Sequence, residues 1–177
     1  MKELFITFAR YNREANQTIA ALLKKLSPGD REKDRGSYYK SLSGLAAHIM
    51  GGEFYLLGMT KDAAAQNSGA LKALEELGKL SVPQGPMDEA QWRRFEEDWA
   101  KADDAMVNFI AALREGDLQA PVAIEWYGGN PPSIPLYFML SQILAHGTHH
   151  RGQISQILDE LKIDNNYSGI NVTFMSP

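Results

Sequence analysis

The sequence contains no cysteine, and this absence removes three kinds of chemistry at once. Without thiols the protein forms no disulfides, offers no thiolate ligand to a metal ion and has no cysteine nucleophile. Any sulfur chemistry that takes place on this protein therefore has to come from a substrate.

The sequence also lacks a basic excess and long apolar runs. Its formal charge is -4, whereas a general nucleic-acid-binding protein gathers basic residues on one face. The most basic stretch, Lys24 to Lys40, alternates with acidic residues and is interpreted as a solvated loop, not a phosphate-binding patch. No apolar run approaches the roughly 20 residues that span a bilayer, and no signal-peptide cleavage site is evident. We therefore expect a cytoplasmic protein with neither a membrane nor a nucleic-acid partner.

Apolar residues recur every three or four positions in four segments, which is the pattern of amphipathic helices. The third segment is the clearest, because Asp88 and Gln91 form a capping-box pattern before it and Gly116 follows it. A length of 177 residues with 44% hydrophobic content suits one core, so residues 1–177 are predicted to form a single domain. The four helical segments are residues 4–26, 41–58, 88–116 and 135–162.

Two connections between these segments carry further information. Residues 59–87 are long enough for a crossover between parallel helices, and residues 69–79 within them are a short helical candidate. Before the fourth segment, Val122, Ile124 and Trp126 alternate with other residues, and a Gly-Gly-Asn turn follows at 128–130. The sequence thus predicts an all-α four-helix bundle with a long crossover between helices 2 and 3, capped at one end by a small β-hairpin or ordered loop.

Histidine is scarce, and its distribution indicates a metal site. There are four histidines, of which three fall within residues 146–150. His146 and His150 lie about 40° apart on one face of the fourth helix, whereas His149 points outward. His48 on the second helix is the third predicted ligand, and the neighbouring Gly44 and Gly52 are expected to leave room for a cavity.

A simpler alternative is that these histidines are separate, partly buried side chains that pair with backbone carbonyls. Two inward imidazoles one turn apart favour a metal, because they crowd each other when neutral and repel when protonated. Gly147 occupies the position of the glutamate in the zinc-protease motif, and no glutamate stands three residues before any histidine as in di-iron bundles. What remains is a three-histidine site with open positions, suited to zinc or nickel.

The pattern His146-x-x-x-His150-Arg151-Gly152-Gln153, with the single His48 upstream, resembles the DinB-like (DNA-damage-inducible, YfiT-like) metalloenzyme family over most of the chain. The resemblance implies a four-helix bundle, often a homodimer, that binds one divalent ion of zinc or nickel through the positions of His48, His146 and His150. Relatives include transferases that use low-molecular-weight thiols, glutathione-dependent isomerases and many members with no known activity. The implied partners are a small thiol and an electrophilic small molecule.

Five other residues are candidates for supporting roles. Gln153 is placed to orient a ligand or the metal-bound water, or it is a plain surface-edge glutamine. Asn12 interrupts an apolar stripe, so it either supports the site or fixes the register between helices. Arg151 points away from the ligands and is expected to form a salt bridge with a neighbouring helix or a dimer partner. Trp126 and Tyr127 are placed at the entrance to the site by chain order.

The leading functional hypothesis is a metal-dependent transferase, or else a hydrolase, in which the ion activates a low-molecular-weight thiol or water. Fold-level analogy favours thiol transfer over hydrolysis, although a fold does not fix the chemistry. No Asp, Glu or Lys stands beside the histidines in the sequence to act as a general base. The alternative is therefore a non-catalytic metal-binding or stress-response protein.

Overall fold

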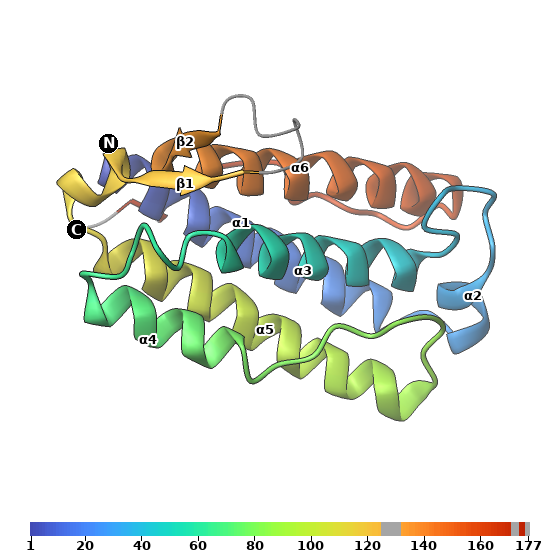
Figure 1. Cartoon of the computed structure of the whole chain (residues 1–177). Coiled ribbons are helices and arrows are strands. Elements are labelled where there is room, and N and C mark those ends of the chain that lie inside the picture. Colours follow the sequence, from blue (N-terminus) through green and yellow to red (C-terminus); the bar gives the residue numbers. More distant parts are fainter. Residues whose placement is uncertain (125–131, 171–173, 176–177) are drawn as a thin grey trace.

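The computed structural model describes residues 1–124, 132–170 and 174–175. The four predicted helical segments are confirmed, although the first ends at Leu23 and the third at Ala112, a few residues before the predicted ends. The predicted cap at Asp88 is present. Ser41 accepts a hydrogen bond from the amide of Gly44, and Asp88 and Gln91 form both bonds of a capping box. The long helices are α1 (Lys2–Leu23), α3 (Leu42–Gly58), α5 (Glu89–Ala112) and α6 (Leu136–Glu160) (Figure 1).

Five shorter elements connect the long helices. The predicted short helix in the long connection is α4, and the predicted hairpin is an antiparallel pair in which Val122 lies opposite Ile134. Trp126, Tyr127 and the predicted turn at 128–130 lie outside the described residues. The short elements are α2 (Pro28–Glu32), α4 (Ser68–Leu77), the 3-10 helix η1 (Glu115–Gln119), β1 (Pro121–Ala123) and β2 (Ser133–Pro135).

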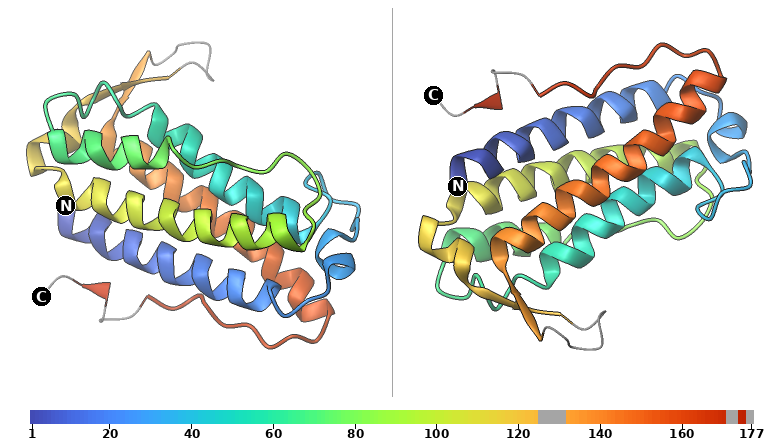
Figure 2. Two further views of the ribbon diagram at one scale, coloured as in Figure 1. Left: turned by 90° about the horizontal axis from the view of Figure 1, so that it is seen from below. Right: turned by 90° about the horizontal axis from the view of Figure 1, so that it is seen from above.

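The crossover between the second and third long helices is also confirmed. In Figure 1 the chain runs in the same direction along α3 and α5, and α4 carries it back between them. Helices α1 and α6 run the opposite way. The principal contacts join α1 to α5, α4 to α5 and α3 to α6, as the two views of Figure 2 also show. This arrangement brings α3 and α6, the two helices that carry the inward histidines, face to face.

Helix α5 supplies the largest side chains of the core. Trp92, Phe95 and Trp99 are at most 1% exposed, and each ring lies 5.3 Å from the next. Burial of one such side chain stabilises the fold by roughly 2–3 kcal/mol, so this row of rings is a rigid support for the remaining helices. Among the described residues, none of the helices has the length and apolar character needed to cross a bilayer.

The prediction of a solvated loop for residues 24–40 is wrong for part of that stretch. Helix α2 lies in it and buries Arg31 completely. The guanidinium of Arg31 donates to the carbonyl of Leu26 at 2.8 Å and to the carboxylate of Glu89 at 2.5 Å, and it lies over the ring of Trp92. A buried arginine is stable here because the carbonyls of Leu23 and Leu26, at the end of α1 and just beyond it, a carboxylate and an aromatic face all meet its guanidinium.

Candidate metal centre

Folding brings the three predicted ligand residues to one point. His48 lies in the middle of α3, and His146 and His150 lie one turn apart on the facing side of α6. The ring centroids are 4.7 Å apart for His48 and His146, 4.4 Å for His48 and His150, and 4.6 Å for His146 and His150. One nitrogen from each ring lies within 4.8 Å of the others. His149 is exposed on the outer side of α6, as the helical wheel predicts.

The ring nitrogens of the three histidines face one another. Nε2 of His146 lies 2.9 Å from Nε2 of His48. Nδ1 of His150 lies 2.7 Å from Oε1 of Gln153, and because an amide oxygen only accepts, Nδ1 carries the proton. Nε2 of His150 is then free for a metal. Tetrahedral zinc with bonds of about 2.0–2.1 Å separates its ligand nitrogens by about 3.4 Å, which small side-chain shifts provide.

All three imidazoles are neutral at neutral pH. Burial, reinforced by the neighbouring His150, lowers the pKa of His48 to about 4. Burial and the surrounding histidines lower the pKa of His146 to about 4, and burial also lowers the pKa of His150. Because a metal binds only the unprotonated ring, protons do not compete for these nitrogens near pH 7.

The two glycines near His48 make room mainly for neighbouring parts of the protein. The prediction that their missing side chains leave a cavity is therefore only partly correct. A Cβ atom on Gly52 would overlap the ring of His146, with Nδ1 only 2.6 Å away. A Cβ atom on Gly44 would collide with the backbone carbonyl of Tyr39. The missing side chain of Gly52 therefore makes space for an imidazole, and that of Gly44 for the segment that precedes α3.

Gly52→Ala is expected to weaken metal binding at least about tenfold with little loss of stability, because the new methyl group displaces only the ring of His146. Titration with a chromophoric chelator measures the affinity. Gly51→Ala is the matched control, since its Cβ would meet the side chain of Val82 at an ordinary 3.5 Å. Equal affinities for the two variants would show that the position of His146 is not needed for binding.

Tyr39 forms part of the site, although no pattern in the sequence indicated this. Its ring stacks on His48 with centroids 3.8 Å apart and an angle of 20° between the planes, and its edge faces His150 at 5.3 Å. Lys40, with a φ of 63°, turns the chain between Tyr39 and the start of α3. Burial raises the pKa of Tyr39, so the phenol stays neutral while it holds the plane of the His48 ring.

A buried polar network lies beside the histidines and joins all four long helices. Nδ2 of Asn12 donates to Glu53 at 2.7 Å, and Nδ2 of Asn16 donates to Asp103 at 2.7 Å. Arg151 donates from Nη1 to the Oδ1 atoms of both asparagines, at 2.5 Å and 3.0 Å. Every member is at most 2% exposed. The network fixes α6, and with it His146 and His150, against the other three helices.

The expected salt bridge of Arg151 is wrong within the described part of the chain. Arg151 does point to a neighbouring helix, α1, but its donors meet the amide oxygens of Asn12 and Asn16 instead of a carboxylate. The two amides lie between the guanidinium and the two acids. Their oxygens accept from Arg151, and their nitrogens donate to Glu53 and Asp103. Asn12 thus makes an inter-helix contact, one of the two roles predicted for it. A Cβ on Gly147 would lie 3.0 Å from Arg151, which explains a glycine there.

Glu53 and Asp103 were missed by the sequence reasoning, and burial raises the pKa of both. The charge of Glu53 raises the pKa of Asp103 further. One guanidinium faces two carboxylates, so the pair binds a proton more tightly than two separate, exposed carboxyl groups would. A folded-state pKa above the unfolded value means that the native protein binds the proton more tightly. Binding of this proton therefore stabilises the folded state at low pH, and this contribution to the free energy of unfolding is lost as the pH rises through the raised pKa.

Asp103→Asn is therefore expected to gain stability relative to the wild type as the pH rises from 5 to 8, by roughly 1–3 kcal/mol. The asparagine keeps an acceptor for Asn16 and carries no charge at any pH. Urea unfolding at a series of pH values measures the difference. Asp104→Asn is the control for the loss of one acidic charge, because Asp104 is exposed, pairs with Arg13 at the surface and is the smallest of the causes that raise the pKa of Asp103. A pH-independent difference would mean that Asp103 is ionised throughout this range.

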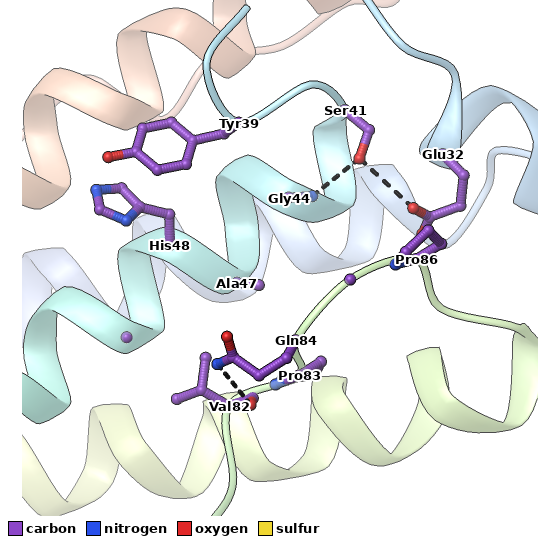
Figure 3. A pocket seen from close by; sticks show the side chains of 12 residues that line it. Glu32, Tyr39, Ser41, Gly44, Ala47, His48, Val82, Pro83, Gln84 and Pro86 are labelled. Carbon is purple, nitrogen blue, oxygen red and sulfur yellow. Dashed lines mark hydrogen bonds between the residues drawn. The ribbon is translucent and has the colours of Figure 1, made fainter.

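Two cavities adjoin the histidine group on either side of His48. The first, of about 350 Å³, lies between α3 and the segment 82–86, and its lining includes Glu32, Tyr39 and Gln84 (Figure 3). The second, of about 440 Å³, is lined by His48, His146, Tyr55, Leu56 and Gln142, among others. His48 and Gly51 belong to both linings. The site is thus open to small molecules from two directions.

The bundle and the donor set together define a class of protein. Three converging neutral imidazoles suit zinc, nickel and similar divalent ions, so the residues fit a metal, and the described residues form a helical bundle that could hold one ion between α3 and α6. The chain belongs to the DinB family, whose model matches residues 1–161. Searches of curated proteins and of solved structures found no match.

Proposed function

We propose that this protein binds one divalent metal ion, zinc or nickel, through His48, His146 and His150, and that it is a metal-dependent transferase acting on a low-molecular-weight thiol. The observation that carries the proposal is the convergence of three neutral imidazoles from two helices. Unlike three separately satisfied histidines, these rings make no bond to a backbone carbonyl within the described residues. They face one another instead.

The chemistry follows from the charge of the ligand set. A divalent ion held by neutral ligands keeps its full charge, and it lowers the pKa of a bound thiol or water enough to supply a nucleophile near neutral pH. The residues of the chain keep the site in order. Gln153 holds His150 in one tautomer, Tyr39 covers one face of His48, and the polar network at Arg151 fixes helix α6.

Thiol transfer is favoured over hydrolysis for three reasons. A thiol with a pKa near 8.5 needs far less activation than water, and none of the described carboxylates or lysines forms a hydrogen bond with the three imidazoles to act as a base. The two cavities on either side of His48 also suit two substrates, a thiol and an electrophile. The homodimer and the cytoplasmic location remain predictions.

The test starts from untagged protein, whose metal content is measured first. A chlorinated aromatic electrophile is then supplied with a panel of small thiols, before and after treatment with a chelator. We expect one metal per chain and a turnover that is lost with the chelator and restored by the metal. Stoichiometric metal without turnover on thiol and ester panels would support the alternative, a non-catalytic metal-binding or stress-response protein. Protein that binds no metal would refute both.

A further inference from the structure

One carboxylate in the cavity between α3 and the segment 82–86 has almost no partner. Oε1 of Glu32 is shielded from solvent and accepts no hydrogen bond from the described residues, and Oε2 accepts one bond of 3.5 Å from Oγ of Ser41. A carboxylate has about four acceptor positions. No cationic side chain of residues 1–124, 132–170 and 174–175 forms an ion pair with it. Such a poorly satisfied charge is costly unless a ligand meets it.

The distance between Glu32 and the histidines sets the length of a ligand that could reach both. Glu32 bonds to Ser41, the residue that caps α3, and His48 lies seven residues further along the same helix. Seven residues of α-helix rise about 10 Å. Figure 3 shows the two groups at opposite ends of the cavity, with Gln84 and Pro83 across from the helix. A small molecule that fills 350 Å³ can touch both ends.

We propose that Glu32 is the binding site for an ammonium group, so that this cavity selects thiols that carry a positively charged amine about 10 Å from the sulfur. A protonated amine supplies up to three donors and a charge opposite to that of Glu32. With the amine at Glu32, the other end of the molecule extends along α3 toward His48. The inference rests on the proposed function, because it takes this cavity as the binding site of the thiol substrate. In this arrangement Glu32 determines which thiols bind.

The test uses 6-aminohexane-1-thiol and 6-mercaptohexan-1-ol, which have the same chain length and differ in the amine. Metal-free protein labelled with nitrogen-15 is titrated with each, and the backbone amides of Gly44, Gly51 and Gly85 report binding. We expect the amine to bind at least about tenfold more tightly than the alcohol, and Glu32→Gln to reduce this preference to about twofold or less. Asp30→Asn, which removes one charge from the same short helix, should retain the preference.

Two results would overturn the inference. Equal affinity of the wild-type protein for the amine and the alcohol would overturn it. Because this comparison needs no variant, it can be made even if the Glu32→Gln protein fails to fold. A preference that persists in folded Glu32→Gln would also do so. Because the titration uses metal-free protein, its outcome is separate from that of the proposed function. Metal-dependent turnover without an amine preference refutes only this inference, and an amine preference in a protein that binds no metal refutes only the proposed function.

Discussion

Arg151→Met is expected to lower the free energy of unfolding by about 3–5 kcal/mol, the cost typical of removing one partner from a buried charged network. Arg151 is 2% exposed and provides the positive charge of the network that includes Glu53 and Asp103. Methionine fills much of the space of the arginine stem but donates no hydrogen bond. The Oδ1 atoms of Asn12 and Asn16 would lose their donor, and the two acids would lose their counter-charge.

Urea denaturation monitored by circular dichroism measures this loss. Arg13→Met is the control, because Arg13 is a half-exposed surface residue paired with Asp104 and should change stability by less than about 1 kcal/mol. Adding Asp103→Asn to Arg151→Met should recover part of the loss, since it removes one of the uncompensated charges. A loss below about 1 kcal/mol for Arg151→Met would mean that water or a rearranged side chain replaces the guanidinium.

His150→Ala is expected to weaken metal binding by at least about 100-fold, the upper limit of what the loss of a supporting partner usually costs. His150 belongs to the group of three imidazoles, and its Nε2 is free because Gln153 occupies Nδ1. Competition against a chromophoric chelator measures the affinity for zinc and nickel at pH 7.5. The wild-type protein should bind one ion per chain in the same assay.

His149→Ala is the matched control for this experiment. His149 is the neighbour of His150 in the sequence, is exposed and lies outside the group of three. Its replacement removes the same ring from the same turn of α6 and should leave the affinity within about threefold of the wild type. An affinity of His150→Ala within tenfold of the wild type, or an equal loss in both variants, would exclude His150 as a ligand.

Much of the fold followed from local patterns. The long helices, the capping box at Asp88 and the hairpin strands were all predicted, because apolar period, cap residues and turn residues act over a few neighbouring positions. The crossover followed from the length of the segment between residues 58 and 89 alone. The pairing of His146 and His150 on one face required only that α6 be a regular helix.

The parts that were missed depend on contacts between distant segments. Glu53 and Asp103 are acids in amphipathic helices, and local patterns place such residues at the surface. They are buried because Asn12, Asn16 and Arg151 arrive from other helices to meet them. Tyr39 and Arg31 lie in a charged stretch, and only the packing of α2 and of the segment before α3 shows that Arg31 is buried and that Tyr39 stacks on His48.

The sequence by itself determined the four long helices, a connection long enough for a crossover, and two imidazoles on one face of the last helix. The helices and the shared face depend on the period of the backbone, which each segment carries alone, and the crossover depends on the length of one connection. The tertiary structure alone decided that His48 meets the other two rings, that Gly52 leaves the space for His146, and that a carboxylate at Glu32 ends the adjacent cavity. Those relations depend on how whole helices pack, and packing is set by many side chains at once.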